Sequence, residues 1–183
     1  MLGDVLLTIE YTALESAIYR NQVVQRLDRT ASGERPFSFR QQFADCWYDL
    51  KNSDLLANDQ LLRVTFETRR SDLPPNLANL CIEHVALYIV RQDGFTDEIQ
   101  VESLLFTEAG SADHVGGAAS TNSGLISTRD ANTGRWLPMQ GKQPSGAWEL
   151  TLPAKVKAWF KDGKIMDILF VITFGGTTPE WPK

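Results

Sequence analysis

Histidine and cysteine are the side chains most often used for metal binding and nucleophilic catalysis, and this sequence has two of each, His84, His114, Cys46 and Cys81. No second histidine or cysteine stands at metal-ligand spacing from either histidine, and neither cysteine lies in a motif typical of a catalytic nucleophile. We therefore expect no catalytic, metal-binding or cofactor-binding residues and a chain that is not an enzyme. His84 is expected to be a hydrogen-bonded strand residue. Both cysteines are expected to be buried thiols, although two cysteines also permit one disulfide.

Two further segments contain residue types that binding sites use. Asp93, Asp97 and Glu98 supply the oxygen ligands that Ca²⁺ prefers, but their spacing matches no calcium loop and favours a solvated hairpin turn. Residues 110–124 are rich in glycine, as phosphate-binding loops are, but they lack the Gly-Lys-Ser/Thr sequence of such loops. The other carboxylates single out no pair for glycosidic chemistry.

The five tryptophans are the remaining candidates for a binding site. Trp47 and Trp148 have apolar neighbours and are expected in the core. Trp136 follows a turn and Trp181 lies in the C-terminal tail, so these two are the predicted surface residues. An exposed tryptophan can anchor a protein interface or stack on a sugar ring, and both uses stay open for Trp136 and Trp181.

Composition narrows the classes of partner. The chain has 183 residues, 43% of them hydrophobic, which suits one folded domain with a substantial core. Its formal net charge is −5 and its basic residues do not cluster, so nucleic acid and anionic membranes are not expected partners. No apolar run reaches the length of a membrane span, and the N-terminus lacks the pattern of a signal peptide.

Alternating apolar residues predict most of the chain to be β-strand, as in a mainly β, antiparallel β-sandwich, of which the jelly roll is one form. The segments at 82–90 and 99–106 flank an Asp-Gly turn and are expected to pair as a hairpin. The predicted strands are residues 3–11, 37–43, 61–68, 82–90, 99–106, 148–152 and 165–174.

Helices and loops complete the expected single domain over residues 1–183. Helical spacing predicts a helix over 14–27, with Thr12 as N-cap and Glu15 as its capping-box partner, and a short helix over 154–160. Residues 30–36 are expected to be a polar connection. Residues 109–124 hold almost no large side chain, so a flexible, exposed loop is expected there.

Residues 4–11 and 167–174 resemble each other, since both begin with aspartate, alternate apolar residues and end with an aromatic. Any buried strand can show this pattern, and a duplicated unit can show it too. The second copy follows a Trp-x-Leu-x-Leu-Pro strand, which the first copy lacks. On the duplication reading, the polypeptide is expected to have been cut from a longer chain.

Several segments, taken in order, are similar to one protein family. GDVLLTIEYTA (3–13) and FSFRQQF (37–43), with Trp47 shortly after, carry the most distinctive likeness. The strand at 82–90 and the segments WELTLP (148–153) and DIL (167–169) extend it over nearly the whole chain. Together they resemble the C-terminal TcB-binding domain of the A component of Tc insecticidal toxin complexes.

This resemblance implies a docking role without chemistry. The domain would end a very large, secreted, homo-pentameric, pore-forming toxin subunit and would bind the B component of the complex. The family supplies no motif-level binding residues that can be carried over. A carbohydrate-binding β-sandwich module, with a glycan bound through Trp136 and Trp181, is the alternative.

Overall fold

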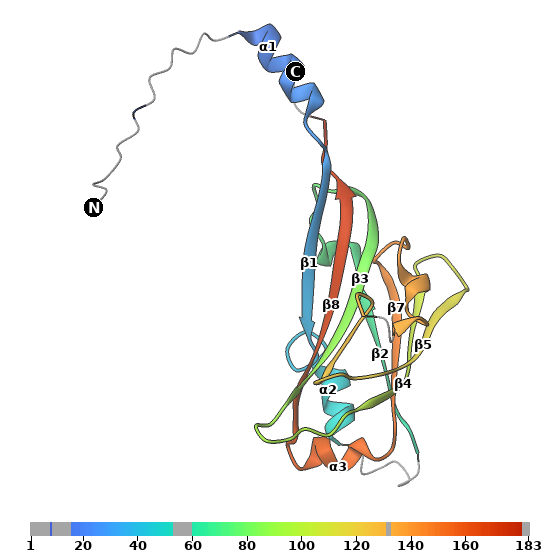
Figure 1. Cartoon of the computed structure of the whole chain (residues 1–183). Helices are drawn as coiled ribbons and strands as arrows, with labels where there is room; N and C mark the ends of the chain where they lie inside the picture. Colours follow the sequence, from blue (N-terminus) through green and yellow to red (C-terminus); the bar gives the residue numbers. More distant parts are fainter. Residues whose placement is uncertain (1–7, 9–15, 53–59, 131–132, 181–183) are drawn as a thin grey trace, which may run out of the picture. The chain divides into compact units, whose positions relative to one another are not determined.

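The fold is described from a computed structural model, which describes residue 8 and residues 16–52, 60–130 and 133–180. The chain divides into two compact units, residues 1–29 with 180–183, and Thr30–Pro179. All described strands belong to the second unit (Figure 1). The expected single sandwich over 1–183 is therefore confined to residues 30–179. The strand predicted over 3–11, with its proposed repeat, lies outside the described residues except for Thr8.

One helix, α1 (Ala17–Arg26), belongs to the first unit, and it confirms the central part of the helix predicted over 14–27. The hydroxyl of Ser16 caps it by accepting a hydrogen bond from the backbone N–H of Tyr19 at 3.3 Å. Thr12 and Glu15, the predicted capping pair, lie outside the described residues. None of the described helices has the length and apolar character needed to cross a membrane.

In its described residues, the second unit has eight strands, two short α-helices and two short 3₁₀ helices. The helices are α2 (Ala44–Lys51) and α3 (Val156–Lys161), and the 3₁₀ helices are η2 (Arg70–Asp72) and η4 (Leu137–Met139). The strands are β1 (Thr30–Ser38), β2 (Leu62–Thr68), β3 (Ala78–Arg91), β4 (Gln100–Glu108), β5 (His114–Ser120), β6 (Leu125–Ser127), β7 (Gly146–Leu152) and β8 (Ile165–Thr177).

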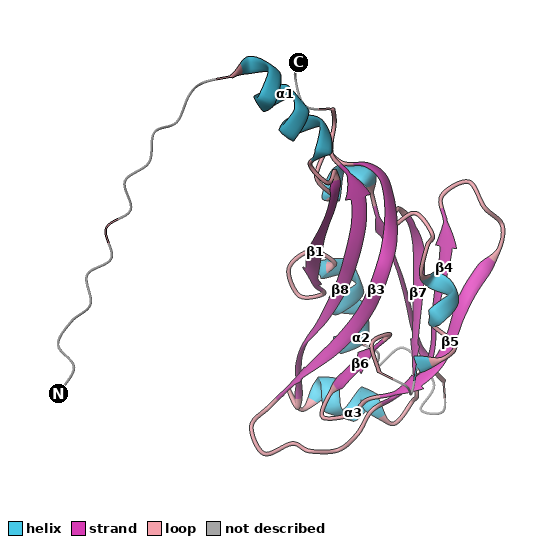
Figure 2. Ribbon diagram, turned by 45° about the horizontal axis from the view of Figure 1, so that its top comes forward, coloured by secondary structure: helices cyan, strands magenta, loops and turns pink. Residues whose placement is uncertain are grey.

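Two four-stranded antiparallel sheets face each other, so the predicted β-sandwich is confirmed (Figure 2). Their strand orders are β1-β8-β3-β6 and β2-β7-β4-β5. The pairs β1–β8, β2–β7, β3–β6 and β4–β5 are each antiparallel, as if a double-stranded ribbon had been wrapped around a core. An eight-stranded double sheet with this order is a jelly roll.

This order corrects the hairpin predicted from residues 82–90 and 99–106. β3 pairs with β8 and β6, whereas β4 pairs with β7 and β5 in the other sheet. The connection between β3 and β4 therefore crosses from one sheet to the other. The Asp93-Gly94 turn signal is local, and it carries no information about which sheet receives the returning strand.

The flexible loop predicted over 109–124 is also wrong, because β5 and the turn before β6 occupy it. Its small residues fit a strand that lies close to its neighbours. A Cβ at Gly116, where φ is +130°, would overlap the carbonyl oxygen of Leu104, and one at Gly117 would meet the Arg135 side chain at 2.8 Å. Backbone pairing with β4 orders this segment although it has few large side chains.

The start of the sandwich differs from the prediction as well. β1 begins at Thr30, in the expected polar connection, and ends at Ser38, inside the strand predicted over 37–43. After β1 the chain turns, because the carbonyl of Ser38 accepts hydrogen bonds from the backbone N–H groups of Gln41, Gln42 and Phe43. The alternating phenylalanines after Ser38 therefore enter the core from a turn, not from a strand.

The core is centred on Trp148, which is buried as predicted. Its ring stacks on Phe106 of the adjacent β4 at 4.1 Å between centroids, and it meets Phe170 of the opposite sheet edge-on at 4.7 Å. Such offset and edge-on contacts are the preferred geometries of aromatic pairs. Trp47 of α2 is half-buried and packs edge-on against Phe160 of α3. The two sheets are thus joined by interlocking aromatic side chains.

Candidate functional site

The predicted surface position of Trp136 is wrong. Its side chain is fully buried, and its indole Nε1 donates a hydrogen bond to the carbonyl oxygen of Gly117 at 2.9 Å. The indole therefore fixes the segment before η4 to β5, and it offers no face for a sugar or a protein side chain. The second predicted residue, Trp181, lies outside the described residues.

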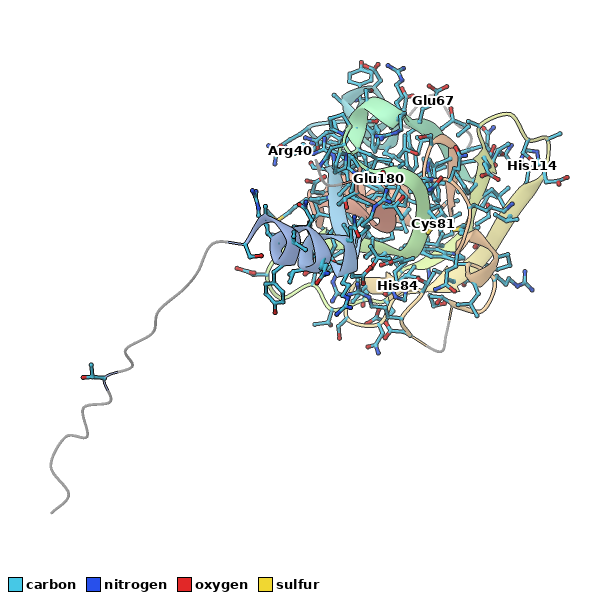
Figure 3. All side chains as sticks on the ribbon, turned by 90° about the horizontal axis from the view of Figure 1, so that it is seen from above. Arg40, Glu67, Cys81, His84, His114 and Glu180 are labelled. Atoms are coloured by element: carbon cyan, nitrogen blue, oxygen red, sulfur yellow. The ribbon has the colours of Figure 1, made fainter. Side chains whose placement is uncertain are left out.

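The two histidines lie on different sheets, His84 in β3 and His114 at the start of β5 (Figure 3). His84 is half-buried, with the Thr128 hydroxyl and the Gln140 amide each 3.4 Å from its Nδ1. His114 is exposed, and its Nδ1 lies 2.6 Å from the hydroxyl of Thr107. Within the described part of the chain, no three histidine, cysteine or acidic side chains gather as a metal site would require.

Glu98 is the acidic residue of the 93–98 segment with the most defined surroundings. Its carboxylate accepts hydrogen bonds from the Thr121 hydroxyl and, at 2.9 Å, from the backbone N–H of Ser123. The Thr121 hydrogen bond is the main cause that lowers the pKa of Glu98. These contacts tie the β3–β4 connection to the segment after β5, which is a structural role.

Neither cysteine forms a disulfide, and both are half-buried. The thiol of Cys46 in α2 donates to the carbonyl oxygen of Thr65 in β2 at 3.2 Å. Burial, followed by the nearby carboxylates of Asp49 and Asp45, raises the pKa of the Cys46 thiol. A raised pKa leaves less thiolate at neutral pH and so does not favour a nucleophilic role.

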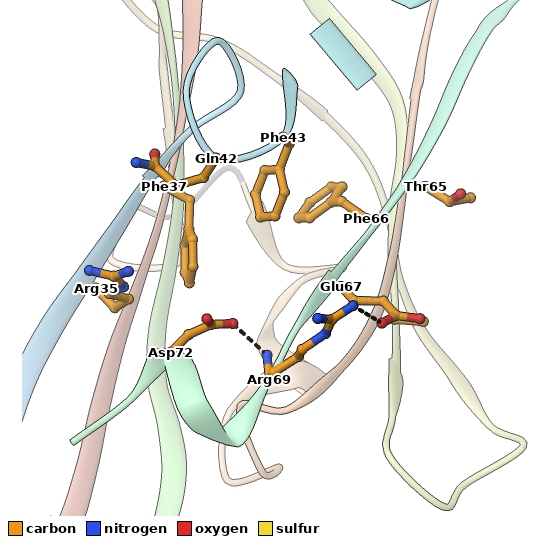
Figure 4. A pocket seen from close by; sticks show the side chains of 10 residues that line it. Arg35, Phe37, Gln42, Phe43, Thr65, Phe66, Glu67, Arg69 and Asp72 are labelled. Atoms are coloured by element: carbon orange, nitrogen blue, oxygen red, sulfur yellow. Dashed lines mark hydrogen bonds and ion pairs between the residues drawn. The ribbon is translucent and has the colours of Figure 1, made fainter. Parts of the chain in front are cut away.

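A concavity lies between the outer edges of β1 and β2, and we call it the β1–β2 groove (Figure 4). Its volume is about 670 Å³. β1 contributes Arg35 and Phe37, and β2 contributes Phe66. Gln42 and Phe43 come from the connection that crosses between the two sheets. The groove is therefore built where the two sheets meet at one side of the sandwich.

Aromatic rings form the apolar part of the β1–β2 groove. Phe43 stacks on Phe37 at 5.4 Å between centroids and packs against Phe66 at 4.7 Å. Phe37 and Phe66 are buried, whereas Phe43 is half-buried and presents part of its ring to the groove. The accessible part of the Phe43 ring, backed by Phe37 and Phe66, can accept an apolar side chain.

The charged side chains of the groove differ in how they are paired. Glu67 forms an ion pair with Arg69 at 3.5 Å, and the carboxylate of Asp72 accepts the backbone N–H of Arg69 at 2.7 Å. Arg35 instead lies over the ring of Phe37, with its guanidinium carbon 5.1 Å from the centroid. Its Nε is buried without a hydrogen-bond partner, and the described residues contribute no carboxylate that pairs with it. The Nε–H of Arg35 is therefore a hydrogen-bond donor in the groove that lacks an acceptor among the described residues.

The β1–β2 groove was not predicted from the sequence, because its residues come from several separate segments between positions 35 and 147. One local signal exists in retrospect. In a strand, Gly33, Arg35 and Phe37 share one face, so a charged residue is placed beside an inward-facing phenylalanine. That pattern is typical of an edge strand, where inward-pointing charges occur.

Comparison with known proteins finds similarity at the level of the fold. No protein-family model and no curated protein matches the chain. The fold is similar to a chain in the cryo-EM structure of Yersinia pseudotuberculosis TcaA-TcaB, with a TM-score of 0.51 and 17% sequence identity. The similarity covers 87% of this chain but only 10% of that chain. At this identity it establishes a shared fold with part of a Tc toxin component.

Proposed function

We propose that this chain is a protein-docking domain of a Tc-like toxin A component, and that it binds the B component of the toxin complex without catalysing a reaction. The observation that carries the proposal is the fold similarity to a chain of TcaA-TcaB over 87% of this sequence. It agrees with the toxin family that the sequence motifs resemble.

The β1–β2 groove supports a docking role of this kind. It combines the half-buried Phe43 ring with an arginine whose Nε has no hydrogen-bond acceptor among the described residues, and aromatic and arginine side chains are the residues that most often dominate protein interfaces. The carbohydrate-binding alternative is weakened because Trp136, one of its two supporting residues, is buried.

The test is direct binding between this chain and the B component encoded in the same genome. We expect biolayer interferometry to give saturable binding, and size-exclusion chromatography to give a co-eluting complex. A B component from an unrelated toxin is the specificity control. Absence of binding both by this chain and by the full-length protein that contains it would overturn the proposal.

Two further parts of the proposal concern the parent protein. We propose that it assembles as a homo-pentamer and is secreted as part of the toxin. Mass photometry of the full-length protein should then give five times the monomer mass, and immunoblots should detect it in the culture medium. A monomeric or cell-retained parent would contradict these two points and leave the docking assignment to be judged by the binding test.

A further inference from the structure

The edges of the two sheets are protected to different extents. In β2 the carbonyl of Thr65 accepts the Cys46 thiol, and in β5 the carbonyl of Gly117 accepts the Trp136 indole. The edge strand β6 has only three residues. β1 has nine residues, and within the described structure it pairs only with β8. An edge strand of this length is a template for pairing with another chain.

The register shows which backbone groups of β1 remain available. The backbone N–H of Phe39 donates to the carbonyl of Ile168 at 2.9 Å. In an antiparallel ladder every second residue is hydrogen-bonded to the partner strand, so this bond shows which residues of β1 are bonded to β8. Arg35 and Phe37 therefore direct their backbone groups toward β8, while those of Ser32, Glu34 and Pro36 face outward. Proline lacks an N–H and is tolerated on such an edge. The outer edge thus offers the donors of residues 32 and 34 and the acceptors of residues 32, 34 and 36.

A strand added to β1 would lie about 4.8 Å from it and would cover the β1–β2 groove. Every second side chain of that strand would share the face of Arg35 and Phe37 and would point into the groove. Beyond Ser38 the outer edge is already closed, because the Gln42 side-chain oxygen accepts the backbone N–H of Ser38 at 2.6 Å. Pairing is therefore confined to residues 32–36.

We propose that the β1–β2 groove binds an extended segment of the partner protein, which pairs as an additional strand on β1 and places a carboxylate against Arg35. The inference rests on the proposed function for the identity of the partner, which would be the B component. Charge complementarity favours a carboxylate, because the guanidinium of Arg35 forms no ion pair with the described residues, whereas Arg69 is paired with Glu67. An apolar side chain two residues away would contact Phe43.

The first test uses a phage-displayed library of random seven-residue peptides selected on the 183-residue chain. We expect enriched peptides to alternate apolar residues with one Asp or Glu. Arg35→Gln should weaken the selected peptides at least tenfold, because a charge-assisted hydrogen bond is lost. Ser32→Pro should also weaken them, because it removes an outward backbone donor. Arg40→Gln, at an exposed position outside the groove, is the matched control and should leave affinity unchanged.

Urea unfolding of each variant separates binding from folding. Arg35→Gln should lower the unfolding midpoint only slightly, because it removes the contact of the guanidinium with the Phe37 ring but no hydrogen bond within the described structure. Enriched peptides without a carboxylate, or peptides bound equally by the Arg35→Gln variant, would overturn the inference, and so would a failure to enrich any peptide.

The same variants distinguish this inference from the proposed function. If the B component binds the wild-type chain and the Arg35→Gln variant equally, the groove inference fails and the docking function stands. If acidic peptides depend on Arg35 but the B component does not bind, the groove inference stands and the proposed partner is wrong.

Discussion

A buried chain of two hydrogen bonds joins three segments of the sandwich and supplies the sharpest test of its energetics. The indole Nε1 of Trp148 donates to the Thr68 hydroxyl at 2.9 Å, and that hydroxyl donates to the carbonyl of Pro144 at 2.6 Å. Trp148 is 1% exposed and Thr68 is 3% exposed. Replacing Thr68 by valine keeps a similar shape, but it leaves the indole N–H and the Pro144 carbonyl without a partner and without access to water.

The size of the effect follows from these two groups. Each buried polar group left unpaired costs about 1–3 kcal/mol, so two of them cost about 2–6 kcal/mol. The additional buried methyl group of valine returns about 0.8 kcal/mol. We therefore expect Thr68→Val to lower the free energy of unfolding by about 1–5 kcal/mol, a range whose upper part is exceptional for a single substitution.

Urea unfolding followed by tryptophan fluorescence measures this change as a lower midpoint with an unchanged m value. Thr65→Val is the matched control, because Thr65 is exposed on the same strand and should shift the free energy of unfolding by less than about 0.5 kcal/mol. The reasoning is refuted if Thr68→Val also stays within about 0.5 kcal/mol of wild type. In a Trp148→Phe background, Thr68→Val should cost less than in wild type, because only the Pro144 carbonyl then loses its partner.

Three further substitutions or titrations test separate features. Gly116→Ala should lower the free energy of unfolding by about 2 kcal/mol or more, because φ is +130° and the new Cβ would overlap the Leu104 carbonyl; urea unfolding measures this. Glu98 should titrate by NMR below an ordinary glutamate, because the Thr121 hydroxyl lowers its pKa, and Thr121→Val should raise that pKa. Its contribution to stability should be present above its unfolded-state pKa and be lost as pH falls through the lowered folded-state value. Cys46 should react with iodoacetamide more slowly at pH 8 than free glutathione, because burial and neighbouring carboxylates raise its pKa.

Each of these predictions has a result that would contradict it. Gly134→Ala is the control for the glycine, because its Cβ would meet no atom within 4 Å; equal stability of the two alanine variants would exclude the steric explanation. An unchanged pKa of Glu98 in Thr121→Val would show that another contact dominates. If Asp49→Asn leaves the alkylation rate of Cys46 unchanged, the Asp49 carboxylate does not contribute to the raised pKa of the thiol.

Strands with one continuously apolar face were predictable from the sequence, and strands whose inward positions hold glycine or arginine were not. In β2 buried and exposed residues alternate without a break, as do the apolar and polar residues of its sequence. In β1 and β5 the inward positions are taken by Gly33, Arg35 and Gly117, so hydrophobic alternation disappears although the backbone is paired. β1 and β5 are strands because they pair with a neighbouring strand, and that pairing leaves no pattern in the local sequence.

The failed prediction for Trp136 has a similar cause. A tryptophan after a polar turn resembles a surface residue when its neighbours in sequence are considered alone. Its hydrogen-bond partner is the Gly117 carbonyl of β5, 19 residues earlier. Burial of the indole therefore involves a contact with β5, the segment whose strand character was also missed.

The position of the β1–β2 groove follows from the wrapping of the chain. Because β1 pairs with β8 and β2 pairs with β7, the first two strands become edges on the same side of opposite sheets. The segment between them must then cross the open side of the sandwich, and it brings Phe43 and α2 with it. α2 contacts the β2 edge through Cys46, so the crossing closes one edge and leaves β1 facing the groove. A peptide that enters the groove meets available backbone groups on β1 and the unpaired guanidinium of Arg35 together, so substitutions of Arg35 and Ser32 should weaken binding of the same ligands.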